Sequence, residues 1–528
     1  MPDDRRGGRG SVVAACAVSA ALLFRRLSDP GLWCDEIYTA RWTRLSLGGL
    51  VASLRSDLHP PLYFVIERVV VRALGESEFT LRALSAACGV AAVAAAAWAF
   101  RPSLGHRGAT RAAWALALMP AFVQYARMAR YYAAAALIAL VAHGVLSRAL
   151  AARGWRPWFA YALAAAAALY TSYVSVALLI GHAAWVWASG AGDARRKWAV
   201  AALVAFALFA PWLWIVAAQV RTAAALPPAA ISGLAGAAAM LGYAWYAFGA
   251  GEWLPPWTTL GLVTFAASAW LVLLGVGEAR RRGLGRALLV PAAVTFVSAW
   301  VLVAGFAHAT PFVSLPARAL FVAPFGAVLL TLGLFGRAPA WARAVAGFLL
   351  CVGWGVALDP LDRRPEIATN PIYLTPGREV ARALASDPRP ADLVLAEDDT
   401  GVNYYLERDR YAGLVVDPSD SFALARALRG APARITWVRL GRDGSARLRP
   451  AGPIRRALAA GWTEVDSSGY LALDRRYVAL KGRLLGTTPE SFRVTVVHWR
   501  LKSGSSPAGA APISKEPEPS GLSVGSNR

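Results

Sequence analysis

The chain has 528 residues, of which 57% are hydrophobic and only 16% are charged, whereas soluble domains carry about 25% charged residues. This composition excludes an ordinary soluble protein and indicates a membrane protein. The net charge of +23 does not indicate a nucleic-acid-binding protein, because the basic residues lie between apolar segments and not along one soluble domain. The cysteines are widely spaced and predict neither a zinc site nor a disulfide framework.

Apolar runs long enough to cross a bilayer as helices, ~20 residues each, follow one another through the first two thirds of the chain. About eleven candidates can be recognised, which predicts an α-helical polytopic membrane protein. They lie at 11–24, 84–100, 112–123, 131–146, 158–170, 174–188, 198–218, 257–276, 288–306, 319–335 and 341–358. No small-residue cleavage site closes the first run, so we expect a retained span and not a secretory signal.

The arginine-rich loops predict the orientation of these spans, because Lys and Arg are enriched in cytoplasmic loops. With a cytoplasmic N-terminus, the arginine-rich loops between later spans all fall on the cytoplasmic side. Because successive loops alternate between the two sides of the membrane, the long first loop, about 25–82, is predicted to lie on the outer side. Everything after residue 358 is then also outside.

The composition changes after residue 358 to that of a soluble module. Strand-like segments such as DLVLAED and RITWVRL alternate with helical ones such as EVARALAS, which predicts an extracytoplasmic α/β domain over 359–500. The last stretch, 501–528, is rich in Ser, Pro and Gly and predicts a disordered tail. The acids Glu397 to Asp399 fit a solvated loop after a strand better than a metal site.

The long first loop carries acidic residues at the predicted outer surface. LWCDEIYTARW holds Asp35 and Glu36 at the start of an amphipathic segment, and RSDLHPPLYF places Asp57 and His59 further along the same loop. Converging carboxylates and an imidazole can deprotonate a hydroxyl group, and Asp and His can also ligate a divalent cation. The alternatives are an ordinary loop histidine and acids that cap a helix, where they contribute about 0.3 to 1 kcal/mol.

Arginines on the same outer side need an explanation, because the topology rule disfavours them there. Arg127 and Arg130 lie in the turn QYARMARYY beside Tyr131, and Arg318 begins a later span. Such side chains can bind a phosphate through charge-assisted hydrogen bonds, and the alternative is snorkelling to lipid headgroups. A base and cations on one side of a membrane are what the transfer of a group from a lipid phosphate requires.

The outer stretch 219–256 is rich in Gly and aromatic residues and ends in GYAWYAFGAGEWLPP. Aromatic faces suit sugar rings and lipids, so one hypothesis is a flexible flap over a substrate cavity. The other is a packed re-entrant or interfacial helix with Trp and Tyr at the level of the lipid headgroups.

Four segments, in the order LWCDE, DLHPPLYFVIERVVVRALGESEFTLRALSAACGV, YARMARYYA and SLPARALFVAPFGAVLL, together resemble the C-type (GT-C) membrane glycosyltransferases. The resemblance is to the bacterial branch related to protein O-mannosyltransferases, aminoarabinose lipid A transferases and lipopolysaccharide-core glycosyltransferases. It implies a GT-C fold over 1–358 and an enzyme of the bacterial cytoplasmic (inner) membrane with its active site outside. Its implied partners are a polyprenyl-phosphate sugar donor and a lipid, polysaccharide or protein acceptor, with inversion at the anomeric carbon.

The resemblance also implies roles for the acidic residues. Asp35, the first acid of the outer loop, corresponds to the proposed base, and Glu36 would position it or tune its pKa. Asp57 corresponds to the second acid, before the HPP motif that contains His59. A divalent metal is bound near there in some members, which makes Asp35, Asp57 and His59 the candidate metal ligands.

The residues expected to bind substrate come from the same motifs and from the arginine groups. They are His59, Arg127, Arg130, Tyr131 and Arg318. Ala319 follows Arg318 where the family often has Tyr, so this chain departs from the family pattern at that position. The alternative function is a multi-pass lipid or glycolipid transporter or flippase without transferase activity, although transporters usually carry their polar residues near the bilayer midplane.

Overall fold

The computed structural model describes residues 3–190, 192–224, 233–305, 315–359, 376–397, 400–440, 451–470 and 494–503. The chain divides into two compact units. The helical unit comprises residues 1–27 and 39–361, and the C-terminal unit comprises residues 28–38 and 362–528. The boundary therefore passes through helix α2 (Cys34–Arg44). The predicted disordered tail lies outside the described residues from 504 onward.

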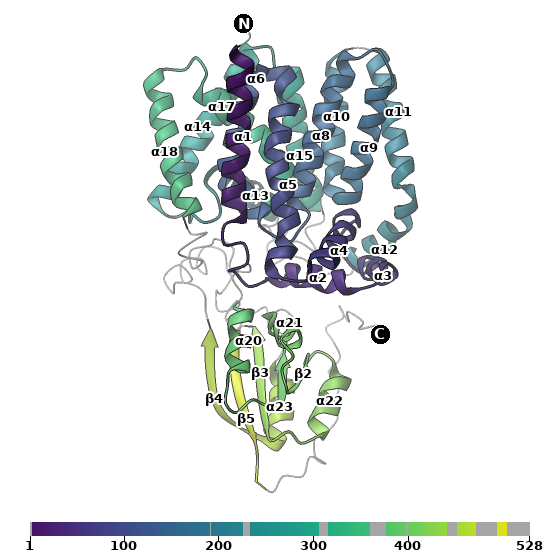
Figure 1. Cartoon of the computed structure of the whole chain (residues 1–528), viewed down its shortest axis with the longest axis vertical. Coiled ribbons are helices and arrows are strands. Elements are labelled where there is room, and N and C mark those ends of the chain that lie inside the picture. Colours follow the sequence, from purple (N-terminus) through teal and green to yellow (C-terminus); the bar gives the residue numbers. More distant parts are fainter. Residues whose placement is uncertain are drawn as a thin grey trace. The chain divides into compact units, whose positions relative to one another are not determined.

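The helical unit is a bundle in which long helices run side by side (Figure 1). The long helices are α1 (Asp3–Phe24), α5 (Glu78–Ala99), α6 (Arg101–Leu118), α8 (Tyr132–Ala151), α9 (Arg156–Thr171), α10 (Val176–Ala188), α11 (Gly192–Phe209), α12 (Leu213–Ala224), α13 (Gly233–Ala250), α14 (Thr259–Arg281), α15 (Val290–Gly305), α17 (Ala323–Leu334) and α18 (Ala340–Leu358). The other α-helices described in this unit are α3 (Leu47–Arg55), α4 (Leu62–Leu74), α7 (Pro120–Ala126) and α16 (Leu315–Arg318).

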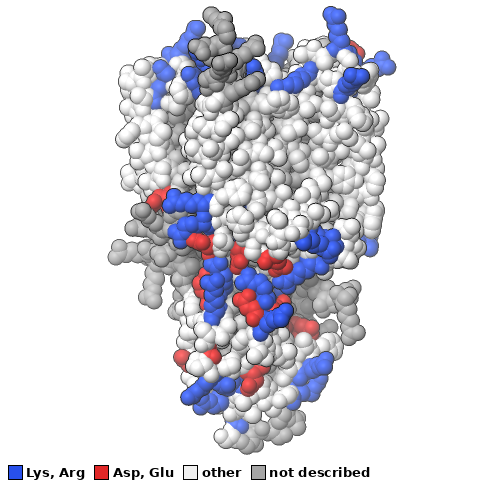
Figure 2. Space-filling view, in the orientation of Figure 1, with Lys and Arg blue, Asp and Glu red and all other residues white. Residues whose placement is uncertain are grey.

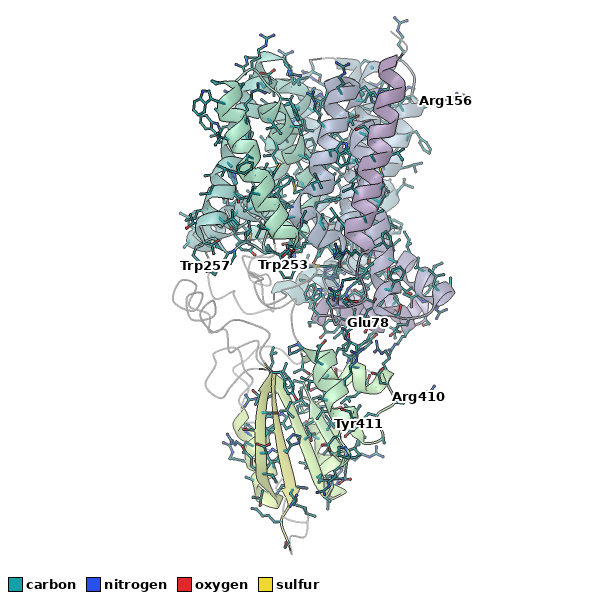
Figure 3. The ribbon with its side chains drawn as sticks, turned by 60° about the vertical axis from the view of Figure 1, so that its left-hand side comes forward. Glu78, Arg156, Trp253, Trp257, Arg410 and Tyr411 are labelled. Carbon is teal, nitrogen blue, oxygen red and sulfur yellow. The ribbon has the colours of Figure 1, made fainter. Side chains whose placement is uncertain are left out.

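Six helices among the described residues are long and apolar enough to cross a membrane. They are Glu78–Ala99, Tyr132–Ala151, Gly192–Thr222, Thr259–Arg281, Gly285–Gly305 and Ala340–Leu358. Figure 2 shows a broad belt of the helical unit without charged side chains, with Lys and Arg beyond both edges of the belt and most Asp and Glu beyond only one of them. Arg156 lies at one end of the bundle, whereas Trp253 and Trp257 lie at the other (Figure 3). The prediction of a helical polytopic membrane protein is confirmed.

Helix α13 is an element that the predicted spans did not include, because its stretch was interpreted as either a flap or an interfacial helix. It occupies residues 233–250 of the stretch 219–256 that is discussed above as a flap. The Tyr246 hydroxyl donates to the Leu254 carbonyl over 2.7 Å, and the Trp354 indole of α18 donates to the Gly249 carbonyl over 2.8 Å. Residues 233–250 are therefore a packed helix, which agrees with that part of the second hypothesis, and its placement at the lipid headgroups stays a prediction. Residues 225–232 lie outside the described residues.

Glycines allow α14 and α17 to pack with their backbones in contact. A Cβ atom at Gly275 would lie 2.0 Å from the Leu329 carbonyl oxygen, and one at Gly333 would lie 2.0 Å from the Leu271 carbonyl oxygen. Small residues at such crossings are how membrane helices gain close van der Waals contact in the absence of a hydrophobic driving force. These two positions therefore require glycine.

The C-terminal unit contains a five-stranded mixed sheet with the order β2-β1-β3-β5-β4. The strands are β1 (Leu393–Ala396), β2 (Leu414–Val416), β3 (Arg434–Leu440), β4 (Trp462–Tyr470) and β5 (Val494–Leu501). The first three pair in parallel and the last two join antiparallel. The helices are α20 (Gly377–Ala385), α21 (Val402–Arg408), α22 (Ser421–Arg429) and α23 (Ala451–Gly461). The predicted small α/β fold is confirmed.

Candidate active site

The loop between α3 and α4 carries the HPP motif. Ser56 ends α3, and the consecutive prolines Pro60 and Pro61 prevent the helix from continuing, because proline lacks an amide donor and disfavours helical geometry before it. The chain therefore makes a short non-helical connection before α4 begins at Leu62. Asp57 and His59 lie in this connection.

The structure joins Asp57, His59 and Arg130 by hydrogen bonds. The Nδ1 atom of His59 contacts Oδ1 of Asp57, and its Nε2 atom lies 2.7 Å from Nη2 of Arg130. A guanidinium group can only donate, so His59 Nε2 must accept and carries no proton. His59 is therefore the neutral tautomer with its proton on Nδ1, donated to Asp57. All three residues were predicted from the sequence, but the sequence does not show that hydrogen bonds connect them in series.

The charges around this chain agree with the assigned tautomer. Burial raises the pKa of Asp57, but contact with His59 and the charge of Arg130 outweigh this effect and bring the pKa down to about 2. Burial lowers the pKa of His59, and the charges of Arg130 and Arg318 oppose protonation further, although Asp57 acts in the other direction. At neutral pH this hydrogen-bonded series therefore consists of the Asp57 anion, the neutral His59 imidazole and the Arg130 cation.

Aromatic rings surround the histidine. The ring centroids of Tyr131 and Phe64 lie 5.4 Å and 5.8 Å from that of His59, and Trp42 lies at 6.4 Å. The Arg130 guanidinium carbon lies 5.5 Å from the Phe64 ring centroid and 5.9 Å from that of Tyr131. These contacts fix the orientation of the imidazole and the guanidinium and keep both in an environment of low polarity.

A second network holds the loop from behind, and it centres on Gln219 of α12. The Gln219 amide donates to the Leu54 carbonyl over 2.6 Å and to the His59 carbonyl over 3.1 Å. Its Oε1 atom accepts from the Tyr173 hydroxyl over 2.6 Å, and Trp212 Nε1 donates to that hydroxyl over 2.8 Å. The loop backbone is thereby tied to α12 and to the corner before α10.

Gln219 is not among the residues predicted from the sequence, because a single neutral amide beside an apolar span belongs to none of the motifs described above. The one available signal was the rarity of the residue type, since Gln124 and Gln219 are the glutamines of this sequence and both adjoin apolar spans. A buried amide at such a place needs partners for its donors and its acceptor. That rule predicts an interaction but does not identify the partner.

Arg127 has a different place from Arg130. Its guanidinium donates to the carbonyls of Leu22, Leu23 and Arg26 at the end of α1, over 2.6, 3.1 and 3.4 Å. A cation that satisfies the last carbonyls of a helix stabilises its C-terminus. The structure therefore places the Arg127 guanidinium at the C-terminal end of α1, and its predicted phosphate contact stays a prediction.

Arg318 and Tyr131 lie with the histidine. Arg318 ends the short helix α16, and its positive charge contributes to the lowered pKa of His59. Tyr131 is buried against the same ring. The predicted substrate-binding residues that come together are thus His59, Arg130, Tyr131 and Arg318.

Asp35 and Glu36 lie in a different unit from these residues, within the segment 28–38. Both are in the first turn of α2. The Glu36 carboxylate accepts from the Trp33 amide over 3.4 Å, while the Glu36 amide donates to the Trp33 carbonyl over 2.9 Å. The first of these bonds is the side-chain half of a capping box, and the second is the first backbone bond of the turn. The capping alternative thus describes Glu36, and Asp35 beside it is half-buried.

The candidate metal ligands do not form a metal site in the part of the chain that the structure describes. No group of three or more His, Cys, Asp or Glu side chains among these residues could hold an ion. His59 uses Nδ1 toward Asp57 and Nε2 toward Arg130, so neither nitrogen is oriented for a metal. Asp35 belongs to the other unit.

Known proteins share both sequence and fold features with this chain. Residues 58–215 match the family described as dolichyl-phosphate-mannose-protein mannosyltransferase. No curated protein sequence matches. The structure of ArnT from Cupriavidus metallidurans bound to undecaprenyl phosphate is 16% identical, with a TM-score of 0.56 over 92% of this chain and 98% of that one. Its apo state is 15% identical, with a TM-score of 0.57 over 93% and 98%.

A more distant match is the Archaeoglobus fulgidus oligosaccharyltransferase tethered to an acceptor peptide. It is 12% identical, with a TM-score of 0.50 over 82% of this chain and 69% of that one. The protein has the fold of the GT-C membrane glycosyltransferases, as the sequence resemblance implied. The family match within that fold indicates a glycosyltransferase and gives no support to the transporter alternative.

Proposed function

We propose that the protein transfers a sugar from a polyprenyl-phosphate-linked donor to a hydroxyl group of a lipid, glycan or protein acceptor. The observation that carries this proposal is the hydrogen-bonded chain of Asp57, His59 and Arg130, with the charge of Arg318 nearby. His59 and Arg130 lie within the residues that match the mannosyltransferase family. A structure of the same fold contains undecaprenyl phosphate, which supports a donor of this class.

The neutral state of His59 matters for phosphate binding. Because the imidazole carries no charge, it does not neutralise the positive charge of Arg130. It also does not repel the Arg130 guanidinium, as a protonated imidazole would. Arg130 and Arg318 together contribute two positive charges, against the one negative charge of Asp57. Cations held in place before the reaction stabilise the charge that develops on a departing phosphate, and they do so most strongly in an environment of low polarity.

The reaction that fits these groups is a single displacement. Asp35 takes the proton of the acceptor hydroxyl, and the acceptor oxygen attacks the anomeric carbon from the side opposite the phosphate. The bond between that carbon and the phosphate oxygen breaks, and the polyprenyl phosphate leaves with the electron pair. The configuration of the anomeric carbon is inverted. Asp57 serves to hold His59 in the tautomer that accepts from Arg130.

We place this reaction at the outer face of a bacterial cytoplasmic membrane. The arginine-rich loops at one end of the bundle support a cytoplasmic end there. Arg156 marks that end in Figure 3, and the opposite end carries the indole rings of Trp253 and Trp257. Tryptophans are enriched at membrane interfaces.

The test is sugar transfer in proteoliposomes supplied with a panel of polyprenyl-phosphate sugars. Asp35→Asn should lower kcat by about 10²- to 10⁴-fold, the range of general-base catalysis, with donor binding retained. Arg130→Met should weaken donor binding. Asp193→Asn removes an exposed acid that pairs with Lys197 on α11 and is the matched control, expected to behave as wild type. Undiminished transfer by Asp35→Asn would refute the assignment of the base, and no transfer by wild type from any donor would refute the function.

A further inference from the structure

The segment 28–38, which carries Asp35 and Glu36, packs within the C-terminal unit and not within the bundle that flanks it in sequence. The Leu32 amide donates to the hydroxyl of Tyr405 over 2.6 Å, across a sequence separation of 373 residues. Tyr405 lies on α21 and is fully buried, and Leu32 is 2% exposed. A buried amide paired with a buried hydroxyl so far along the chain is a specific tertiary contact.

A second contact holds the beginning of the same segment. Arg378 of α20 donates to the carbonyls of Ser28, over 2.9 Å, and of Asp29. The chain comes so close at Gly31 that a Cβ atom there would lie 3.3 Å from Cβ of Arg378 and 3.5 Å from the Tyr405 hydroxyl. Helices α20 and α21, which carry these two side chains, pack against each other (Figure 1).

Apolar side chains of the segment 28–38 also pack within the C-terminal unit. Leu32, Trp33 and Ile37 are all buried. Gly401, at the start of α21, has a φ of +70°, and a Cβ atom there would lie 2.5 Å from Cδ1 of Ile37. Glycine is thus needed at this position both for its left-handed backbone and for the room that it leaves for Ile37.

We propose that the C-terminal unit positions Asp35, with Tyr405 and Arg378 as its positioning residues. The two contacts fix the backbone from Ser28 to Leu32, and the cap between Trp33 and Glu36 fixes the next turn. Asp35 lies inside that turn, so the backbone that carries its carboxylate is held by groups of α20 and α21. This inference rests on the proposed function, because it takes Asp35 as the base.

The inference gives the soluble unit a part in catalysis. A base in a loop that samples many conformations reaches its substrate rarely, and holding it in one geometry raises the rate of proton transfer without tighter donor binding. Loss of the positioning contact should therefore lower kcat and leave the KM for the donor unchanged.

The experiment compares Tyr405→Phe with Tyr411→Phe. Both variants remove one hydroxyl from the same unit, but the Tyr411 hydroxyl donates to the Ala391 carbonyl over 3.2 Å, within the α/β fold (Figure 3). Hydrogen exchange of residues 29–37 should be roughly three- to tenfold faster in Tyr405→Phe, the loss expected for one buried hydrogen bond, and unchanged in Tyr411→Phe. Sugar transfer by Tyr405→Phe should show a kcat at least fivefold lower at an unchanged donor KM.

A second pair of variants tests the same idea through charge. Arg378→Gln removes the guanidinium that binds the two carbonyls, whereas Arg382→Gln removes an exposed guanidinium on the same helix. Only the first should accelerate exchange at 29–37 and lower kcat.

The outcomes separate the inference from the proposed function. Unchanged exchange in Tyr405→Phe would overturn the contact, and faster exchange with unchanged kcat would overturn its role in catalysis. If the wild-type protein transfers no sugar, the proposed function fails, and with it the catalytic meaning of the contact. The exchange data would then still decide whether the C-terminal unit holds the segment.

Discussion

Gln219 offers the most direct test of how the histidine loop is held. Replacing it with leucine keeps the volume of the side chain but removes three hydrogen bonds, two to the carbonyls of Leu54 and His59 and one from the Tyr173 hydroxyl. Each buried hydrogen bond contributes about 0.5 to 1.5 kcal/mol. The loop should therefore lose about 2 to 4 kcal/mol of local stability. A loss in the middle of this range raises the equilibrium constant for local opening of the loop by about 100-fold or more.

The assay is hydrogen exchange of the peptide covering residues 54–61, in protein reconstituted into nanodiscs. Gln124→Leu is the matched control, because it also replaces a buried glutamine of the helical unit and removes a 2.6 Å bond to Glu252. We expect exchange at 54–61 to accelerate by roughly 30-fold or more in Gln219→Leu alone. Acceleration below threefold, or an equal effect of both variants, would refute the reasoning.

Three further predictions concern other parts of the helical unit. Because burial holds the pKa of His59 below its ordinary value of 6.5, the stability contributed by the neutral ring is complete above pH 6.5 and is lost as the pH falls through the folded pKa. The Tm advantage of wild type over the non-titrating His59→Gln should accordingly shrink between pH 7.5 and about 5 in thermal melts; an advantage that stays constant would contradict the assigned tautomer. Arg127→Met should lower the Tm by removing the cap of α1 while leaving the donor KM unchanged, and a tenfold rise in that KM would instead support the predicted phosphate contact. Gly275→Ala should destabilise the protein by about 1 to 3 kcal/mol, the range for overpacking, because its Cβ atom would meet the Leu329 carbonyl, whereas a Cβ atom at Gly277 has nothing within 4 Å and Gly277→Ala should melt as wild type does.

The fold was predictable from the sequence because both of its signals are strong. Long apolar runs have few structural solutions in a membrane, and alternating strand and helix patterns predict an α/β sheet. Helix α13 escaped because its Ala and Gly content gives no clear apolar periodicity. The predicted count of about eleven spans stays a prediction, since length and composition single out six helices among the described residues.

The site was predictable only as a set of residue types. The motifs identified His59 and Arg130, but the hydrogen bond between them joins two segments 71 residues apart, which no local pattern encodes. Arg127 and Arg130 look equivalent in QYARMARYY. They differ because α7 ends at Ala126, so that Arg127 faces the end of α1 while the following turn carries Arg130 toward the histidine.

The C-terminal unit is built from two separate parts of the chain, 28–38 and 362–528, and this affects the biosynthesis of the protein. Leu32 leaves the ribosome 373 residues before Tyr405, and at about 5 to 20 residues per second this delay is roughly 20 to 75 s. During that time the segment around Asp35 exists without the helices that hold it. A chain released early can insert its spans but cannot complete this segment, so the last part to be synthesised decides whether the first loop reaches its final form.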